Sequence, residues 1–298
     1  MPVSSVKIIV SAHAGAGDNY EICKRFETVF NEAGIKTDSS LGQSGADVIA
    51  LAREAADGPY EIIVAAGGDG TVNSIASAIV NTEKVLGVLP LGTLNHFARD
   101  LKIPSDLEAA AQTIVAGNIS KVDVGEVNDR IFLNNSSLGL YPIIVHEREK
   151  RERLGSGKWS AFFWATIQAF RRYPFLDVRL RIDNEQFDRR TPFAFIGNNH
   201  YAMEAFNVGL RDRLDKGLLS IYITHRTSRL GLISLGLRAV VGRLRDDRDL
   251  LAISSDEVKI ETRYKHLRVA LDGEVEVMDT PLRYRVRPGA LRVIVPRN

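Results

Sequence analysis

The feature that most constrains this chain is a change of pattern near Lys121. Before it, short apolar runs alternate with amphipathic segments whose apolar residues recur at the spacing of one helix face. Strands that alternate with helices form a parallel sheet covered by helices, so residues 1–122 are predicted to be an α/β domain. The predicted strands are Val6–Val10, Ile62–Ala66 and Leu86–Leu89, and the predicted helices are 19–33, 46–56, 71–80 and 106–116.

After Lys121 the chain consists mainly of short β-like runs separated by turn residues such as Asp183-Asn184. Many short strands of this kind are typical of a β-sandwich, so residues 123–286 are assigned to such a domain. Two helix-like segments, 158–173 and 228–244, interrupt the strands. The predicted strands are Val122–Val127, Ile131–Asn134, Leu176–Ile182, Pro192–Gly197, Leu218–Thr224, Val258–Thr262, Leu267–Leu271 and Leu282–Val286.

The composition excludes several classes of protein. Lys and Arg number 39 against 37 Asp and Glu, and the net charge of +2 is too small to indicate nucleic-acid binding. No apolar run approaches the roughly 18 residues of a membrane-spanning helix, and Val6–Val10 is too short for a signal peptide. The single cysteine, Cys23, lies in a predicted helix and is expected to be a buried apolar residue in a cytoplasmic protein.

A glycine-rich loop follows the apolar strand that ends at Ala66. Its sequence is Gly67-Gly68-Asp69-Gly70-Thr71-Val72-Asn73, and the next predicted helix begins inside it. Glycines let the backbone approach a ligand closely and adopt positive φ, and the N–H groups at a helix start attract anions. Asp69 would repel phosphate unless Mg²⁺ lay between them, so it implies a metal. The alternative is a tight turn that binds nothing.

A second polar loop, Leu91-Gly92-Thr93-Leu94-Asn95, follows the next predicted strand and also leads into a helix. Open α/β sheets bind ligands in the crevice at the carboxyl ends of neighbouring strands. Two glycine-bearing loops at such ends are therefore expected to line one crevice. Neither loop has the Walker pattern or the spacing of the dinucleotide fingerprint.

The pair GGDGTVN and PLGTLNHFARDL resembles the diacylglycerol kinase catalytic family, which includes bacterial lipid kinases and sphingosine kinases. The resemblance implies an α/β nucleotide domain and a β-sandwich, with residues 287–298 returning to the first domain. It also implies ATP contacts from Gly67 through Asn73 and from Gly92 and Thr93, while Asn95 shapes the crevice. A hydroxyl of Ser39 or Ser40, expected in the loop after the second strand, would touch the nucleotide.

The resemblance extends to Leu271-Asp272-Gly273-Glu274, which matches the segment that holds the family's catalytic base. Asp272 or Glu274 would then accept the proton of the lipid hydroxyl, a role that a carboxylate can fill in phosphoryl transfer. Without a ligand, Asp272-Gly273 is a plain hairpin turn. Asp123 resembles a family aspartate in the Mg²⁺ network, and its alternative role is that of a solvated carboxylate at a strand end.

Three features depart from the family pattern. Residues 11–17 follow the first predicted strand where the family usually has Asn-Pro before the glycines, and Ser11 is expected to preserve that turn. His96 stands where many members have an aspartate after Gly-Thr-x-Asn, and Lys216 stands where a carboxylate of an accessory Mg²⁺ site is usual. Asp212 and Asp215 remain as candidate ligands of that accessory site. Because a lysine repels a cation, the accessory site is not expected to survive.

These patterns predict an ATP- and Mg²⁺-dependent lipid kinase, with diacylglycerol as the first candidate acceptor. One alternative is an enzyme related to NAD kinase, which shares the GGDG loop. The other is a non-catalytic relative that binds a nucleotide or a lipid. A lipid acceptor implies a peripheral protein at a membrane surface, where the basic and apolar stretches 158–172 and 226–245 would bind. A homodimer through a strand edge of the β domain is also open.

Overall fold

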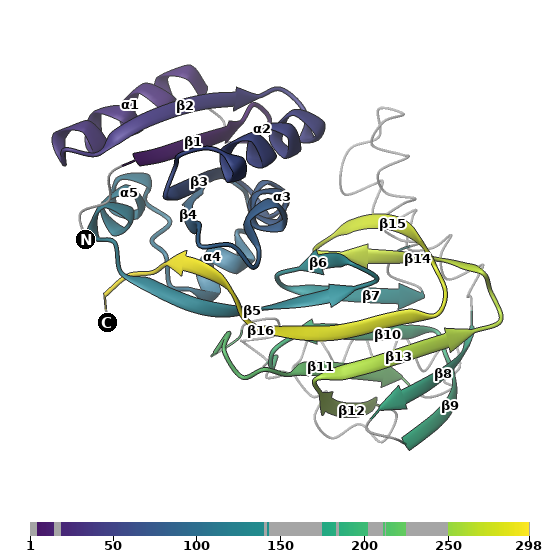
Figure 1. Cartoon of the computed structure of the whole chain (residues 1–298). Helices are drawn as coiled ribbons and strands as arrows, with labels where there is room; N and C mark the ends of the chain where they lie inside the picture. The colour runs from purple at the N-terminus through teal and green to yellow at the C-terminus, as the bar shows by residue number, and fades with distance from the viewer. Residues whose placement is uncertain are drawn as a thin grey trace. The chain divides into compact units, whose positions relative to one another are not determined.

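The computed structural model describes residues 5–14, 19–139, 142, 175–182, 185–201, 211, 213–224 and 250–297. The chain forms two compact units (Figure 1). The first unit contains Met1–Val124 and Pro288–Asn298, and the second contains Gly125–Arg287.

The first unit is built on a parallel sheet. Its strand order is β2-β1-β3-β4, with bounds β1 Ser5–Ser11, β2 Lys36–Gly42, β3 Ile62–Gly67 and β4 Val85–Pro90. Strand β16 (Leu282–Ile294) adds Arg292 and Val293 beside β4, again in parallel. Because β2 and β3 lie on opposite sides of β1, the chain reverses its direction of winding there. Ligand sites of open α/β sheets form at such a switch point.

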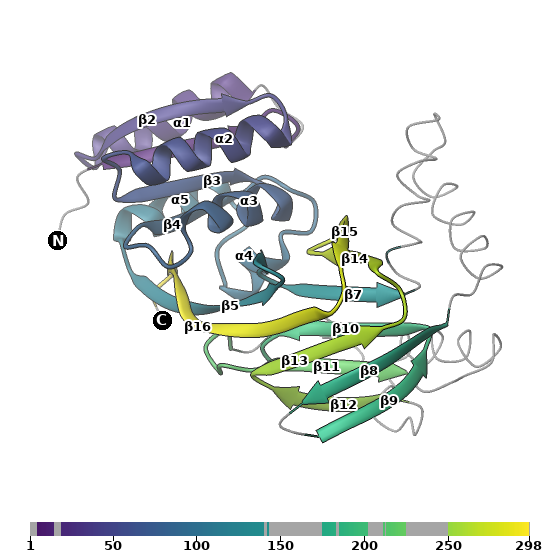
Figure 2. The ribbon, with the colours of Figure 1, turned by 45° about the vertical axis from the view of Figure 1, so that its right-hand side comes forward.

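Helices cover both faces of this sheet. In Figure 2, α2 (Gly45–Asp57) and α3 (Asp69–Ile79) lie in front of it, while α1 (Asn19–Glu32) and α5 (Leu107–Ala116) lie behind. Strands β3 and β4 are buried along their whole length, as expected for parallel strands between two helical layers. The side chains of Ser44 and Asp106 cap α2 and α5 by accepting backbone N–H groups, which sets where those helices begin.

The second unit is an antiparallel β-sandwich. One sheet has the order β12-β11-β10-β7-β14-β15. In the other, β13 pairs with β8 and with the first part of β16, β8 pairs with β9, and β5 forms a hairpin with β6. The bounds are β5 Ile119–Val127, β6 Arg130–Phe132, β7 Asn135–Gly139, β8 Leu176–Ile182, β9 Glu185–Thr191, β10 Phe193–Asn198, β11 Leu219–Thr224, β12 Leu250–Ser255, β13 Glu257–Thr262, β14 His266–Leu271 and β15 Glu274–Asp279.

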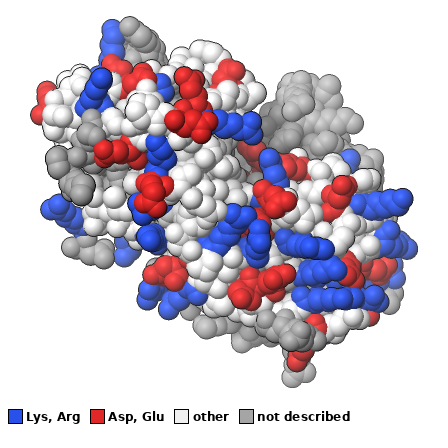
Figure 3. Space-filling view, in the orientation of Figure 1, with Lys and Arg blue, Asp and Glu red and all other residues white. Residues whose placement is uncertain are grey.

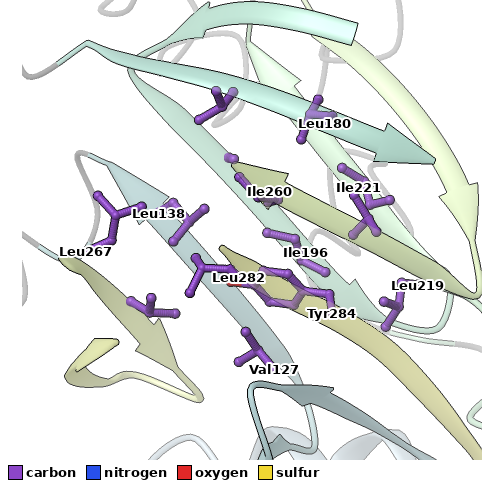
Figure 4. Packing of buried hydrophobic residues seen from close by; sticks show 14 of the residues in the cluster. Val127, Leu138, Leu180, Ile196, Leu219, Ile221, Ile260, Leu267, Leu282 and Tyr284 are labelled. Atoms are coloured by element: carbon purple, nitrogen blue, oxygen red, sulfur yellow. The ribbon is translucent and has the colours of Figure 1, made fainter. Parts of the chain in front are cut away.

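Apolar side chains from both sheets form one core in the second unit (Figure 4). Leu138, Ile196 and Ile221 project from one sheet, and Leu180 and Ile260 from the other. The largest member is Tyr284, whose hydroxyl lies 3.0 Å from Ser136 Oγ, so its polar end is hydrogen-bonded inside the core. The alternation of buried and exposed residues along β8 is the pattern expected for one face of such a sandwich.

The structure confirms the predicted fold class, a parallel α/β domain followed by a β-sandwich. The sequence patterns did not predict β2, β7, β9, β12 and β15. Strands β9 and β15 lie at sheet edges and are polar, so they lack the apolar pattern used to find strands. The predicted helical segments 158–173 and 228–244, residue Asp212 and the side chain of Cys23 lie outside the described residues.

Candidate active site

The first glycine loop joins the end of β3 to the start of α3. A Cβ atom on Gly67 would lie 2.4 Å from Thr71 Oγ1, so no larger residue fits between the strand and the first turn of the helix. Gly68 is the N-cap of α3 with φ −87°, a value open to any residue. The expected positive φ is wrong for the glycines of both loops. A Cβ atom on Gly68 would make only an ordinary contact, at 3.4 Å from the Cα of Gly92, so in this loop it is Gly67 that close approach requires to be glycine. The first N–H groups of α3 point towards the carboxyl edge of the sheet, where they can bind an anion.

The two glycine loops touch backbone to backbone. A Cβ atom on Gly92 would lie 2.6 Å from the Cα of Gly68, and the N–H of Leu91 donates to the carbonyl of Gly67 at 3.0 Å. Both loops thus lie side by side at the carboxyl ends of β3 and β4. This contact is the arrangement expected of two loops that line one crevice.

The carboxylate of Asp69 connects the first loop to the helix that follows the second. Its Oδ2 accepts the N–H of His96 and its Oδ1 accepts the N–H of Phe97, each at 3.2 Å. These residues open the short helix α4 (His96–Asp100). The contact uses the main chain of His96, so it does not depend on whether a histidine or an aspartate stands there. Asp69 therefore has a structural role besides the predicted metal role.

Asn95 holds the second loop in shape. Its Oδ1 accepts the N–H of Gly92 at 3.0 Å, and its Nδ2 donates to the Gly92 carbonyl at 2.8 Å. The residue itself has φ 48° and ψ 48°, a left-handed conformation that asparagine tolerates well. With its amide committed to its own loop, Asn95 shapes the crevice, and the two residues before it, Thr93 and Leu94, are exposed.

Two buried polar atoms in the first unit have no hydrogen-bond partner among the described residues: Asn73 Oδ1 and Ser39 Oγ. Buried polar atoms are normally paired, so orphans of this kind indicate a ligand or water. Both residues belong to the predicted nucleotide set. Ser39 and Ser40 lie inside β2 and not in a loop after it, which corrects their predicted place. The side chain of Val72 is buried in the core, so only its backbone can face a ligand.

The predicted metal ligands that the structure describes are Asp69, Asp123 and Asp215. Among the described residues, no group of three or more His, Cys, Asp or Glu side chains could hold a metal ion. Asp123 is buried and its Oδ1 accepts the N–H of Gly289 at 2.9 Å. Asp215 is bound by both Nε and Nη2 of Arg213, at 2.8 and 2.6 Å, and this guanidinium lowers the pKa of Asp215. Asp69, in the first glycine loop, accepts one N–H group on each carboxylate oxygen, so each oxygen keeps a lone pair that could bind a metal.

In the second unit, Asp272 lies in the turn between β14 and β15 with φ 47°. Its carboxylate accepts three successive backbone N–H groups: Leu133 at 2.7 Å on Oδ2, and Asn134 at 2.8 Å and Asn135 at 3.0 Å on Oδ1. A solvated hairpin turn needs no such nest of donors. The hairpin turn expected at Asp272-Gly273 is present, but the side chain of Asp272 points inward and its carboxylate is bound by backbone N–H groups.

Desolvation raises the pKa of Asp272 to about 6, against the three backbone N–H groups and Arg211, which lower it. A carboxylate with such a pKa is charged at neutral pH and is a stronger base than an exposed aspartate. Glu274 is exposed at the start of β15, where its backbone pairs with Leu271. Of the two predicted catalytic carboxylates, Asp272 is thus the one that accepts three backbone N–H groups and has a raised pKa.

A buried polar network that the sequence analysis missed surrounds this carboxylate. Arg211 is only 3% exposed, and its guanidinium donates to the carbonyls of Leu133 and Asn198 and to the side chain of Asn134. The available signal was the pair of asparagines at Asn134-Asn135, and again at 198–199, within β-like runs. Asparagine is depleted in strands, so such pairs indicate side chains needed for hydrogen bonding.

Over β8, β9 and β13, Asp and Glu side chains lie among the Lys and Arg side chains of the surface (Figure 3). Arg179 binds Asp188 at 2.8 Å, Lys259 binds Glu261 at 2.7 Å, and further pairs follow along the same strands. No helix among the described residues is long and apolar enough to cross a membrane.

Comparison with known proteins agrees with this architecture. Residues 5–127 match the diacylglycerol kinase catalytic domain, and residues 141–295 match the YegS C-terminal NAD kinase beta sandwich-like domain. A diacylglycerol kinase of Staphylococcus epidermidis is 26% identical over 246 residues, covering 82% of this chain and 77% of its own length. One of Staphylococcus carnosus is 28% identical over 200 residues, covering 66% and 65%.

The crystal structure of a diacylglycerol kinase from Bacillus anthracis superposes with a TM-score of 0.73 at 20% identity, covering 99% of this chain and 98% of that one. This likeness concerns the fold. Two glycine loops on a parallel sheet, followed by a β-sandwich, define a two-domain kinase fold of the lipid-kinase type. The chain belongs to the diacylglycerol kinase catalytic-domain family, whose members are phosphotransferases with an alcohol group as acceptor.

Proposed function

We propose that the chain transfers the γ-phosphoryl group of ATP, bound with Mg²⁺, to a hydroxyl group of a membrane lipid, with diacylglycerol as the first acceptor to test. The names of its relatives support the acceptor class. The observation that carries the proposal is the carboxylate of Asp272, held by three backbone N–H groups with a pKa of about 6.

Asp272 is suited to activate an alcohol. An alcohol is a weak nucleophile, and a base within hydrogen-bond reach assists its attack by accepting the proton. Oδ2 of Asp272 accepts only one of the three N–H groups, which leaves an acceptor position for the hydroxyl. The three amides fix the direction of that position, so the base does not have to be ordered when the acceptor arrives.

The first unit is suited to bind the phosphates. The start of α3 and the adjoining glycine loops offer backbone N–H groups without side chains in the way. The orphaned Asn73 Oδ1 and Ser39 Oγ fit polar atoms of a nucleotide. These residues therefore fit ATP, and the proposal assigns donor binding to this unit and acceptor activation to the second.

Mg²⁺ usually keeps several waters and binds through one or two carboxylates together with the phosphates. When bound, it would neutralise charge on the phosphates. Asp69 fits this mode, because each of its oxygens retains a lone pair after capping α4. Asp123 is the second candidate, while the Asp215 carboxylate is already engaged by Arg213.

A lipid acceptor implies binding at a bilayer surface. Residues 226–245 contain five arginines and no acidic residue, with leucines and an isoleucine between them. Such a composition favours anionic bilayers. Flotation with vesicles that contain phosphatidylglycerol should carry the protein upward at low salt, and neutral vesicles should not.

The decisive experiment offers labelled ATP and Mg²⁺ to the purified chain with separate acceptors: vesicles of diacylglycerol, phosphatidylglycerol or a sphingoid base, and free NAD. Labelled lipid that disappears when Mg²⁺ is chelated supports the proposal. Labelled NADP without labelled lipid would favour the NAD kinase alternative. Bound ATP with no labelled product from any acceptor would favour a non-catalytic relative.

A further inference from the structure

The peptide bond between Leu133 and Asn134 lies between two charged groups. Its N–H donates to Asp272 Oδ1 at 2.8 Å, and its carbonyl oxygen accepts Nη1 of Arg211 at 2.6 Å. A cation therefore lies at the oxygen end of the peptide dipole and an anion at its N–H end. Each charge polarises the peptide in the direction that strengthens the bond at the other end.

The rest of the guanidinium fixes the same segment. Nη2 of Arg211 donates to Asn134 Oδ1 at 2.7 Å, and Nη1 also donates to the carbonyl of Asn198 at 3.1 Å. Asn198 in turn binds the Leu133 carbonyl through its Nδ2 at 3.0 Å. The planar fork of an arginine can make these bonds at once, whereas an ammonium group would not match their geometry.

The carbonyl of Asn134 accepts the backbone N–H of Asn198 at 2.9 Å, but among the described residues the carbonyl of Leu133 is held by side chains alone. Leu133 and Asn134 form a bend between β6 and β7, outside the ladder of either strand. A bend of this kind can rotate its peptide planes, and one rotation would point the carbonyl of Leu133 at the carboxylate in place of the N–H of Asn134. The contacts of Arg211 oppose that rotation.

We propose that Arg211 is a positioning residue for phosphoryl transfer, which acts on Asp272 through the Leu133–Asn134 peptide. Arg211 holds the N–H groups of residues 133–135 around the carboxylate and keeps the basic oxygen in one direction. This role rests on the proposed function of Asp272 as the base. Among the residues that the structure describes, Arg211 is the charged group that lowers the pKa of Asp272, and Glu274 is the acidic residue two positions further on.

The test compares Arg211→Met with the wild type in kcat for lipid phosphorylation between pH 5 and 8. Loss of the cation and of ordered N–H donors should move the acid limb of kcat to higher pH by about one unit, so that kcat at pH 5 falls about tenfold. The KM for ATP should stay unchanged. Arg285→Met is the matched control, because Arg285 binds Glu126 in the same unit and touches none of residues 133–135. Its acid limb should match the wild type.

Each outcome has a distinct meaning. If Asp272→Asn keeps wild-type kcat, the proposed function of Asp272 fails and this inference with it. If Asp272→Asn is inactive but folded Arg211→Met retains the wild-type acid limb and kcat, the positioning role alone is overturned. Should Arg211→Met show no cooperative melting transition, Arg211→Gln decides the case by the same pH profile. If neither variant folds, Arg211 is a purely structural residue and the inference is overturned.

Discussion

Oδ1 of Asp69 lies 3.2 Å from the backbone nitrogen of Phe97, so a side chain of the first glycine loop caps the helix after the second. The same acid is the candidate that faces Mg²⁺. Replacing it should therefore damage stability and turnover together, and a matched variant can separate the two effects.

Asp69→Ala should abolish turnover and lower the free energy of unfolding by about 1 kcal/mol, the usual cost of a lost cap. Asp106→Ala removes a comparable cap, because Asp106 accepts the N–H of Ala109 at 2.9 Å at the start of α5. It should lose similar stability and keep full activity. Thermal melts and lipid phosphorylation assays measure both quantities. Asp69→Ala with normal kcat would limit Asp69 to the structural role.

Gly92→Ala should force the two glycine loops apart, since its Cβ would lie 2.6 Å from the Cα of Gly68. Overpacking of this kind costs about 1–3 kcal/mol of stability, and ATP affinity should fall with it. Gly45→Ala is the control, because nothing lies within 4 Å of a Cβ there. Calorimetric titration with ATP checks the prediction, and equal affinity in the two variants would show that the loops need not touch.

Asn73→Ala should weaken ATP binding without destabilising the protein. Its Oδ1 has no partner among the described residues, so the folded chain loses no bond of that atom when it is removed. Asn95→Ala should do the reverse and lower stability, because the Asn95 amide makes bonds to Gly92 at both ends. An Asn73→Ala variant with lower melting temperature and unchanged ATP affinity would contradict the assignment.

Asp272 should give the enzyme an acid limb near pH 6. Its pKa is raised to about 6, so kcat should fall about tenfold for each unit below that pH as the base becomes protonated. The contribution of Asp272 to the free energy of unfolding should depend on pH in the opposite direction from kcat. The proton is held more tightly by the folded than by the unfolded chain, so the contribution of this group is fully present below the unfolded pKa near 3.8 and is lost as the pH rises through 6.

The matched control for this profile is Asp279→Asn, at the exposed end of β15. It should leave the acid limb in place, whereas Asp272→Asn should remove turnover. If Asp279→Asn moves the acid limb of kcat as far as substitutions around Asp272 do, the limb reports the net charge of the protein and not the protonation of the base.

The sequence could predict the elements that carry strong local patterns. Strands β3 and β4 are continuous apolar runs, and the glycines that follow them indicate the loops at their ends. The reason for glycine at position 92 could not be read from the sequence, because it depends on the close approach of Gly68 from the first loop. The cap that Asp69 provides for α4 also joins residues nearly thirty positions apart.

The environment of Asp272 was beyond sequence analysis for the same reason. The motif indicated a carboxylate, but the three N–H groups come from residues 133–135, far away in the chain. Arg211 lies in yet another segment and follows no helical or strand pattern. Periodicity reports which face of an element is buried, whereas a polar network is defined by contacts between elements.

The most direct test of the account is the product formed when labelled ATP, Mg²⁺ and diacylglycerol vesicles meet the wild type or Asp272→Asn at pH 7.5. The account predicts labelled phosphatidic acid, identified by mass, from the wild type and none above background from a folded Asp272→Asn that still binds ATP. Labelled phosphatidic acid from both proteins at equal rates would contradict it.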